Sequence, residues 1–248
     1  SSLAWAASVH VYLRRAADFA VMNEVYATYW PTDPPARTTI VATLSHPDAL
    51  VEMSAVGVAA GEPREVVHPT AWVRSPNPYS YGIRSGDTLF LSGLVSRSGR
   101  DNGLIQGDIA VQTKVVLDNA REVLAAAGMD PGDIVSSRVF ITDPSAFPQM
   151  NAAYRPFFAS DPPPRATVVC ELMNPAFQVE ITFVAVKGAA ASRRVFGAPG
   201  PQGPPFSRAV AAGGRLFVTG MLGVTPETRT DLGAQTRQTL ASVRGALK

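Results

Sequence analysis

The chain has 248 residues, of which 46% are hydrophobic and 17% charged, with 22 basic side chains against 20 acidic ones and a single cysteine. These totals predict a soluble globular protein of one or two domains and exclude a mainly disordered chain, because the apolar side chains suffice for a core. The net charge of +2 is too small to indicate a nucleic-acid or membrane partner.

The first stretch of the chain, SSLAWAASVHVYLRR, is expected to form a strand. It lacks the basic start of a signal peptide, so no leader is expected. No apolar run in the sequence approaches the ~20 residues that cross a bilayer. The lone Cys170 cannot close an internal disulfide, which makes a cytoplasmic setting the expectation.

Seven elements are predicted in the middle of the chain, in the order strand, strand, helix, strand, helix, strand, strand. A β-rich run at 88–95 follows a turn signal, and 108–127 shows apolar residues at helical spacing. A strand at 134–141 and a helix over 145–158 come next, and Pro156 should bend or stop that helix. This order predicts an α+β domain with both helices on one face of a mixed sheet.

The last predicted strand alternates between apolar and polar side chains. Val179, Ile181 and Phe183 fall on one face and Glu180 on the other, so the apolar face is expected to pack on the helices. Glu52 lies in a similar pattern near the start of the chain. An acidic residue facing away from the helices, found twice, requires either water or a second protein surface on that side.

An internal repeat runs through the sequence. Residues 18–56 match residues 146–184 at a constant offset of 128, as in Asn23 with Asn151, Arg37 with Arg165 and Glu52 with Glu180. Residues 78–93, PYSYGIRSGDTLFLSG, match residues 205–220, PFSRAVAAGGRLFVTG, at an offset of 127. A constant offset over such lengths indicates two copies of one structural unit.

The order of the matches predicts the domain organisation. The complete unit spans 76–188, the back half of a second unit spans 1–60, and its front half spans 205–248, with linkers at 61–75 and 189–204. The two ends of the chain are therefore expected to meet at a surface loop. The sequence leaves open whether the split unit is closed by its own two ends or by those of a neighbouring chain.

These segments together resemble the YjgF/RidA family, also named endoribonuclease L-PSP. The resemblance is carried by PYSYGIRSGDTLFLSG, QTKVVLDNAREVLAAAG, AFPQMNAAYRPFF, PPPRATVVCEL and the VEI strand. It implies a chorismate-mutase-like α+β fold that assembles as trimers, with ligand clefts between subunits. It also implies hydrolysis of reactive enamine or imine intermediates such as 2-aminoacrylate to 2-oxo acids and ammonia, without a cofactor.

The resemblance also implies roles for individual residues. Arg165, and Arg37 in the split copy, occupy the family's carboxylate-binding position, and a guanidinium suits it because its planar fork makes two parallel charge-assisted bonds. Glu180 and Glu52 match the acidic position, where a carboxylate can orient water and transfer a proton. Tyr79 matches the aromatic residue that covers the ligand.

Further positions of the family cleft are matched by small and polar residues. Phe206 replaces the covering tyrosine in the split copy. Thr167 and Thr39 stand where deaminase members commonly carry a cysteine, which leaves the substrate open. The remaining predicted cleft residues are Asn23, Ser92, Gly93, Asn151, Thr219 and Gly220.

Each role has a structural alternative. An arginine at a strand entrance is often a surface ion pair, Glu180 could line a wet channel between subunits, and Tyr79 could be a packed aromatic residue. Cys170 is expected to be an inert core residue. The three histidines are scattered without the spacing of metal ligands, so no metal site is predicted; they are His10, His46 and His68.

Three functions remain open from the sequence. A deaminase of small carboxylate-bearing metabolites is favoured by the arginine and glutamate found in both copies. A non-catalytic protein that binds such a metabolite would use the same cleft. An L-PSP-type endoribonuclease is disfavoured, because no stripe of basic and aromatic residues could track RNA. Two units cannot close a ring of three, so a homotrimer of two-unit chains is predicted, with two stacked rings.

Overall fold

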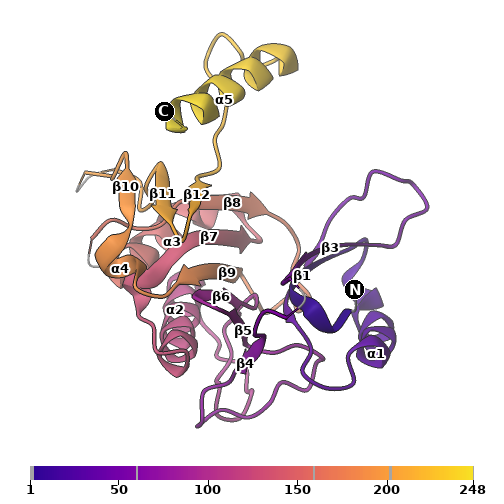
Figure 1. Cartoon of the computed structure of the whole chain (residues 1–248). Coiled ribbons are helices and arrows are strands. Elements are labelled where there is room, and N and C mark those ends of the chain that lie inside the picture. Colours follow the sequence, from indigo (N-terminus) through magenta and orange to yellow (C-terminus); the bar gives the residue numbers. More distant parts are fainter. Residues whose placement is uncertain (1–2, 60, 159, 201–202, 248) are drawn as a thin grey trace.

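A six-stranded mixed sheet forms the centre of the molecule (Figure 1). The computed structural model describes residues 3–59, 61–158, 160–200 and 203–247. β7 and β8 are parallel, and the other neighbours in this sheet are antiparallel. From edge to edge the strands are β4 (Glu65–Val67), β5 (Gly82–Ser85), β6 (Thr88–Leu91), β9 (Val179–Val186), β7 (Ile134–Ile141) and β8 (Arg165–Val169). We call residues 65–186 the central unit.

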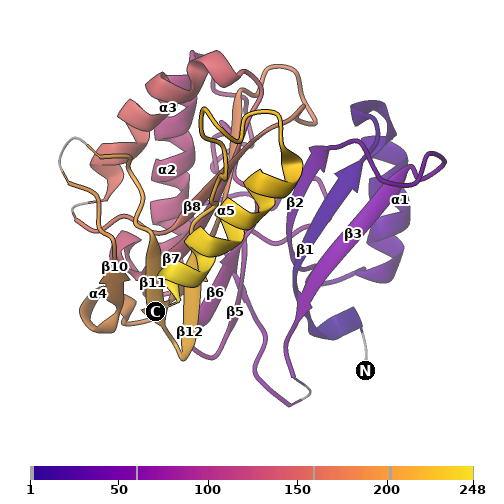
Figure 2. The same ribbon diagram turned by 90° about the horizontal axis from the view of Figure 1, so that it is seen from above.

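Two helices, α2 (Ile109–Ala126) and α3 (Phe147–Tyr154), cover one face of this sheet (Figure 2). The Asp108 side chain starts α2 by accepting a hydrogen bond from the Val111 N–H at 2.9 Å. The predicted helix at 108–127 and the predicted strand at 134–141 are confirmed. The α+β class with both helices on one face is confirmed as well.

Two predicted elements are shorter than expected. The helix expected over 145–158 is α helical only in α3 and is flanked by 3₁₀ turns at Pro144–Ala146 and Arg155–Phe157. Proline stands in each of these turns, where it removes an N–H from the helical ladder. The strand expected at 88–95 ends at Leu91, because the next residues bond to other segments.

Strand β9 has protein on both faces. Val179, Ile181 and Phe183 are buried against the helices, as the alternation predicts. Thr182 is also buried, and its hydroxyl lies 2.9 Å from that of Thr38 in the N-terminal part of the chain. The polar face of β9 is therefore covered by a second protein surface rather than by water.

The N-terminal segment (residues 3–58) repeats the arrangement of half the central unit. Its sheet has the order β2-β1-β3, with β1 and β2 parallel and β1 and β3 antiparallel, as β7 lies between β8 and β9. A helix packs on one face, with Met22 and Tyr26 in a small core. The elements are η1 (Leu3–Trp5), β1 (Ala6–Leu13), η2 (Ala16–Asp18), α1 (Phe19–Tyr29), β2 (Ala36–Val41) and β3 (Val51–Gly57).

The C-terminal segment (residues 189–200 and 203–247) resembles the other half of the central unit. Its strands β11 and β12 form a hairpin, and the sheet order β10-β11-β12 repeats β4-β5-β6. The last helix, α5, stands clear of the sheets in Figure 1. The elements are α4 (Ala189–Ser192), β10 (Arg194–Phe196), β11 (Ala209–Ala212), β12 (Arg215–Val218) and α5 (Leu232–Ala246).

The expectation that the two ends of one chain meet is wrong for this structure. The N-terminal and C-terminal segments form separate three-stranded sheets on different sides of the central unit (Figures 1 and 2). The expected linkers also carry structure, because β4 lies within 61–75 and β10 within 189–204. Each segment packs on the central unit instead of on its own missing half.

Candidate active site

A cavity of about 260 Å³ opens between the N-terminal segment and the central unit. It brings together side chains that lie far apart in the sequence, among them one buried arginine and one buried glutamate. Its lining residues are Phe19, Arg37, Thr39, Asn77, Tyr79, Gly93, Val95, Arg97, Met173, Asn174, Phe177 and Glu180.

Two hydrogen bonds from the Arg37 backbone to the central unit fix the position of this residue. Its N–H donates to the Ser92 hydroxyl at 2.8 Å, and its carbonyl accepts from the Gly93 N–H at 3.0 Å. The Ser92 hydroxyl in turn donates to the Ser80 carbonyl at 2.6 Å. The start of β2 is thus bonded to the residues that directly follow β6. Ser92 orients Arg37 and does not line the cavity.

The guanidinium of Arg37 is buried and has an unused donor. Its side chain lies between aromatic rings, 4.8 Å from the centre of Tyr26 and 5.7 Å from that of Tyr79. Its Nη1 has no hydrogen-bond partner. Burial lowers the pKa of the guanidinium, which stays charged because arginine is not deprotonated in proteins. A buried cation with a free donor is suited to bind an anion.

Glu180 faces the same cavity from β9. Burial raises the pKa of its carboxyl to about 8, while the Thr39 N–H and the charge of Arg37 act in the opposite direction. Gly93 makes room for this side chain, since a Cβ on Gly93 would lie 1.8 Å from Glu180 Oε1. A carboxyl that titrates near neutral pH can both donate and accept a proton.

Tyr79 and two asparagines complete this end of the cavity. Burial raises the pKa of Tyr79, whose hydroxyl pairs with Ser75. Asn23 donates from Nδ2 to Asn77 Oδ1 at 3.1 Å, so it acts on the site through Asn77 instead of lining it. Sequence reasoning did not identify Asn77, although it stands two residues before Tyr79.

Arg165 occupies an equivalent position between the central unit and the C-terminal segment. Its N–H donates to the Thr219 hydroxyl at 3.2 Å, and its carbonyl accepts from the Gly220 N–H at 3.0 Å. Its guanidinium lies 5.1 Å from the ring centre of Phe206 and donates from Nη2 to Asn151 Oδ1 at 2.6 Å. The contacts of the Arg37 site are therefore repeated here with different side chains.

The second arginine has no acidic neighbour among the described residues. Burial lowers the pKa of Arg165, and Tyr154 is the neighbour that opposes this shift. Glu52 lies in the exposed strand β3, and Thr167 lies half-buried in β8 outside the cavity. The structure therefore brings Arg37 together with Glu180, and it leaves Arg165 and Glu52 in separate places.

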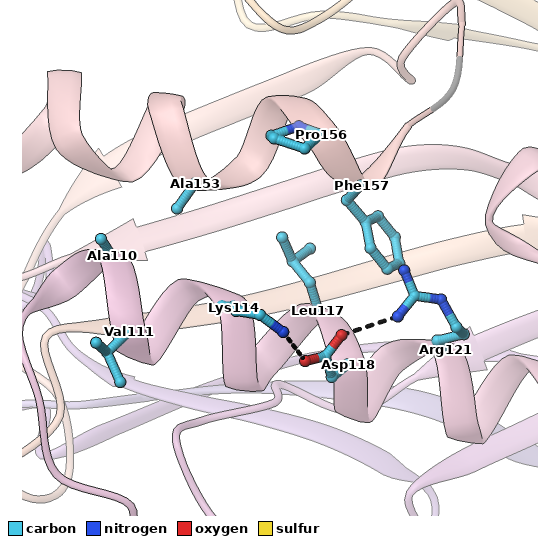
Figure 3. A pocket seen from close by; sticks show the side chains of 9 residues that line it. All are labelled: Ala110, Val111, Lys114, Leu117, Asp118, Arg121, Ala153, Pro156 and Phe157. Carbon is cyan, nitrogen blue, oxygen red and sulfur yellow. Dashed lines mark hydrogen bonds and ion pairs between the residues drawn. The ribbon is translucent and has the colours of Figure 1, made fainter.

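A larger groove of about 480 Å³ between α2 and α3 has a different character (Figure 3). Its charged groups satisfy one another: Asp118 pairs with Lys114 at 2.7 Å and with Arg121 at 2.8 Å. Arg121 also stacks on Phe157, 4.9 Å from the ring centre. No buried unpaired group points into this groove in Figure 3, so we do not assign a site to it.

In the described ranges, no group of three or more histidine, cysteine, aspartate or glutamate side chains could hold a metal ion. None of the helices in these ranges is long and apolar enough to cross a membrane.

Comparisons with known proteins place the central unit in a family. The family model described as Endoribonuclease L-PSP matches residues 71–187. A RutC family protein of Sulfurisphaera tokodaii is 38% identical over 111 residues, which are 45% of this chain and 89% of that relative. Protein DfrA of Myxococcus xanthus is 33% identical over 125 residues, 50% of this chain and 95% of that relative.

Solved structures also cover half of the chain. YyfA of Yersinia pestis, described as a Rid family protein of unknown function, is 30% identical with a TM-score of 0.48, covering 50% of this chain and 99% of that one. The YjgF gene product of E. coli is 28% identical with a TM-score of 0.46, covering 50% and 98%. Because half of this chain spans nearly the whole length of relatives more than 30% identical to it, the chain belongs to the endoribonuclease L-PSP family, the YjgF/RidA proteins.

Proposed function

We propose that the cavity between the N-terminal segment and the central unit hydrolyses small enamine or imine acids, such as 2-aminoacrylate, to 2-oxo acids and ammonia. One observation carries this proposal: a buried guanidinium with a free donor, Arg37, shares a cavity with a carboxyl group, Glu180, whose pKa is raised to about 8. The first group can hold the substrate carboxylate, and the second can move a proton.

The reaction needs a placed water molecule and one proton carrier. After the enamine has become the imine, the neutral Glu180 carboxyl protonates the imine nitrogen. Water then adds to the imine carbon and gives a proton to the Glu180 carboxylate. The carboxylic acid formed in this way protonates the amino group of the adduct, the C–N bond breaks and ammonia leaves. The proton of the adduct's hydroxyl returns to Glu180 as the 2-oxo acid forms. No covalent enzyme intermediate is required, because the imine carbon is already electrophilic.

The surrounding residues support these two roles. Tyr79 and Phe19 lie beside Arg37 and exclude water from the anion site, which strengthens the ion pair with the substrate. The backbone N–H of Thr39 holds Glu180, and this contact does not depend on the side chain at position 39. The reaction requires the protein to position the substrate and to transfer a proton. Neither role requires a cysteine at the position of Thr39.

The test is ammonia release from freshly generated 2-aminoacrylate, measured above the spontaneous rate. Glu180→Gln keeps the shape of the side chain and removes its proton carrier, so kcat is expected to fall ~100-fold or more. Glu171→Gln is the control, because Glu171 is an exposed glutamate of the same unit; it should retain the wild-type rate. Full activity in Glu180→Gln would exclude this mechanism.

The same assay separates the alternative functions. Wild-type protein that binds a 2-oxo acid in an Arg37-dependent way, but releases no ammonia, would be a metabolite-binding protein. RNA cleavage that persists through repeated purification, and is lost in Glu180→Gln, would support a nuclease instead.

A further inference from the structure

Residues that are buried in the central unit have exposed counterparts in the N-terminal segment. Val51 and Met53 of β3 are 44% and 45% exposed, whereas the equivalent Val179 and Ile181 of β9 are fully buried. An apolar cavity of about 520 Å³ adjoins them. It is lined by Leu3, Leu13, Asp18, Val21, Met22, Val25, Tyr26, Tyr29, Trp30, Leu50, Val51 and Met53.

The C-terminal segment likewise exposes apolar side chains whose counterparts in the central unit are buried. Leu240 and Leu247 are 62% and 60% exposed, although the equivalent Leu117 and Leu124 of α2 are 2% and 0% exposed. The equivalence follows from the Gln-Thr pair shared by α2 and α5, at 112–113 and 235–236. An isolated helix with such an apolar stripe is marginal in water without a partner surface.

The central unit shows which partner each surface fits. There, β9 pairs with β6 along the edge that β3 leaves free, and α2 packs beside α3 in a single core. The N-terminal segment has the counterparts of β7, α3, β8 and β9 but lacks those of β5, β6 and α2. The C-terminal segment has the missing three as β11, β12 and α5.

We propose that the N-terminal segment of one chain is the docking surface for the C-terminal segment of a second copy of this chain. The strand β12 would extend the sheet at β3, and α5 would pack beside α1 over the apolar cavity. A second copy is the occupant because both segments of one chain are held elsewhere, at the Arg37–Ser92 and Arg165–Thr219 contacts. Such contacts are heterologous, so chains would join head to tail and close into rings.

Light scattering on the full chain tests this proposal. The wild type is expected to have the mass of two or more chains, and a mass of three chains would agree with the predicted trimer. Leu240→Asp and Val51→Asp should each shift the protein to a single chain, because each places a charge in one of the two surfaces. Ala234→Asp is the matched control on α5, since its counterpart Val111 stays exposed in the central unit.

Mixing the two variants separates docking from misfolding. Each variant keeps one intact surface, so an equimolar mixture of Leu240→Asp and Val51→Asp is expected to form a one-to-one complex. A wild type that is monomeric at every concentration would overturn the proposal. So would variants that keep the wild-type mass, or a mixture in which both stay monomeric although their circular dichroism is native.

A second inference concerns the substrate, and it rests on the proposed function. Arg97 lines the same cavity as Arg37. Its guanidinium stacks on Phe177, 5.1 Å from the ring centre, and donates from Nη1 to the Asn102 carbonyl at 2.8 Å. No ion pair between described side chains involves either arginine.

The charges in this cavity do not balance. Glu180 is the single acid among the described residues that line it, and burial raises its pKa to about 8, so it is mostly neutral at pH 7. The two arginines therefore leave a surplus of positive charge in a partly closed site. Such a surplus attracts anions and favours a ligand with two negative groups over one with a single group.

The geometry points to an imino acid with a second carboxylate on its side chain, held by Arg37 at one carboxylate and by Arg97 at the other. Imines generated from aspartate or glutamate by an amino-acid oxidase should then be hydrolysed better than the imine from alanine. Arg97→Gln is expected to lower kcat/KM by ~10- to 100-fold for the dicarboxylic imines, and by less than ~3-fold for the alanine-derived imine.

Arg100→Gln is the control, because Arg100 is exposed in the same loop. Equal losses for both imine classes in Arg97→Gln, or none for either, would overturn this assignment. Binding of a 2-oxo dicarboxylate, measured by calorimetry, tests the dianion site without requiring that the protein hydrolyses imines. Loss of that binding in Arg97→Gln, in a protein that hydrolyses no imine, would refute the hydrolase and retain the dianion site.

Discussion

The Arg37 site and the Arg165 site share one anchoring pattern and differ in chemistry. In both, the arginine N–H donates to a hydroxyl, Ser92 or Thr219, and its carbonyl accepts from the following glycine N–H. Among the described residues, a buried acid faces the guanidinium at Arg37 and not at Arg165, where an amide takes its place as acceptor. The repeat therefore reproduces the backbone contacts that anchor each arginine, whereas the acid at the Arg37 site comes from the opposite unit.

The largest expected difference between the sites is in the anion anchor. Arg37→Gln should lower kcat/KM for 2-aminoacrylate by ~100- to 1,000-fold, about 3–4 kcal/mol, because the charge-assisted bonds to the carboxylate are lost. Arg165→Gln should change it by less than ~3-fold, since no acid in the part of the chain that the structure describes adjoins that arginine. The measurement is ammonia release, and equal losses in the two variants would contradict the distinction.

The next largest difference is expected in kcat when the glycine beside each arginine is replaced by alanine. Gly93→Ala would place a Cβ 1.8 Å from Glu180 Oε1 and so displace the carboxyl, whereas the nearest side-chain atom to a Cβ on Gly220 is Ala166 Cβ at 3.1 Å. Gly93→Ala should reduce kcat ~10- to 100-fold by moving the proton carrier. Gly220→Ala should leave kcat within ~2-fold. A Gly93→Ala enzyme with wild-type kcat would show that Glu180 need not be held there.

The two sites should also contribute differently to the pH dependence of stability, because among the described residues a buried acid is present at the Arg37 site alone. Burial raises the pKa of Glu180 from 4.5 to about 8, so the folded state binds a proton that the unfolded chain has lost. Its contribution to stability is complete below pH 4.5 and is lost as the pH rises through 8.

The useful window for this measurement lies above pH 6.5. Burial lowers the pKa of His10 to about 4, so its contribution is complete above 6.5 and falls only on acidification. Between pH 6.5 and 8 the free energy of unfolding should fall by about 2 kcal/mol in the wild type. Urea titrations should show a flatter profile in Glu180→Gln but not in Glu171→Gln, which changes an exposed glutamate; a parallel profile in Glu180→Gln would contradict the raised pKa.

The smallest expected effect concerns the covering aromatic ring. Tyr79→Phe removes a hydroxyl that pairs with Ser75 and should raise KM ~2- to 5-fold with little change in kcat. Phe206→Tyr, the reverse change at the Arg165 site, should leave both constants unchanged. If Tyr79→Phe lowers kcat by a larger factor than it raises KM, the hydroxyl takes part in proton transfer.

Much of the fold could be predicted from local patterns. The helix α2 and the strand β7 were both expected, because apolar spacing reports directly which side chains face a core. The helix around Phe147 was predicted too long, since proline in the flanking turns changes the backbone without disturbing the apolar pattern. The strands β4 and β10 were missed because each has three residues, too few to show alternation.

The candidate site was predicted in part. Arg37, Glu180, Tyr79 and Gly93 were all named as site residues, and the structure brings these four together. Asn77, Arg97 and Asn174 were missed, as they lie in loops where no periodic signal exists. Their place in the cavity depends on how the loops cross the opening between two parts of the chain.

The repeated unit, its α+β class and the anchoring arginine of each copy could be predicted from the amino-acid sequence, because they follow from short-range patterns and a constant offset. Tertiary structure alone decided that Arg37 meets Glu180 while Glu52 stays exposed. Both copies of the repeat carry an equivalent arginine and an equivalent glutamate, so no local sequence pattern predicts which arginine lies beside which glutamate. That choice is made by packing between the N-terminal segment and the central unit, where distant backbone groups and buried faces must match.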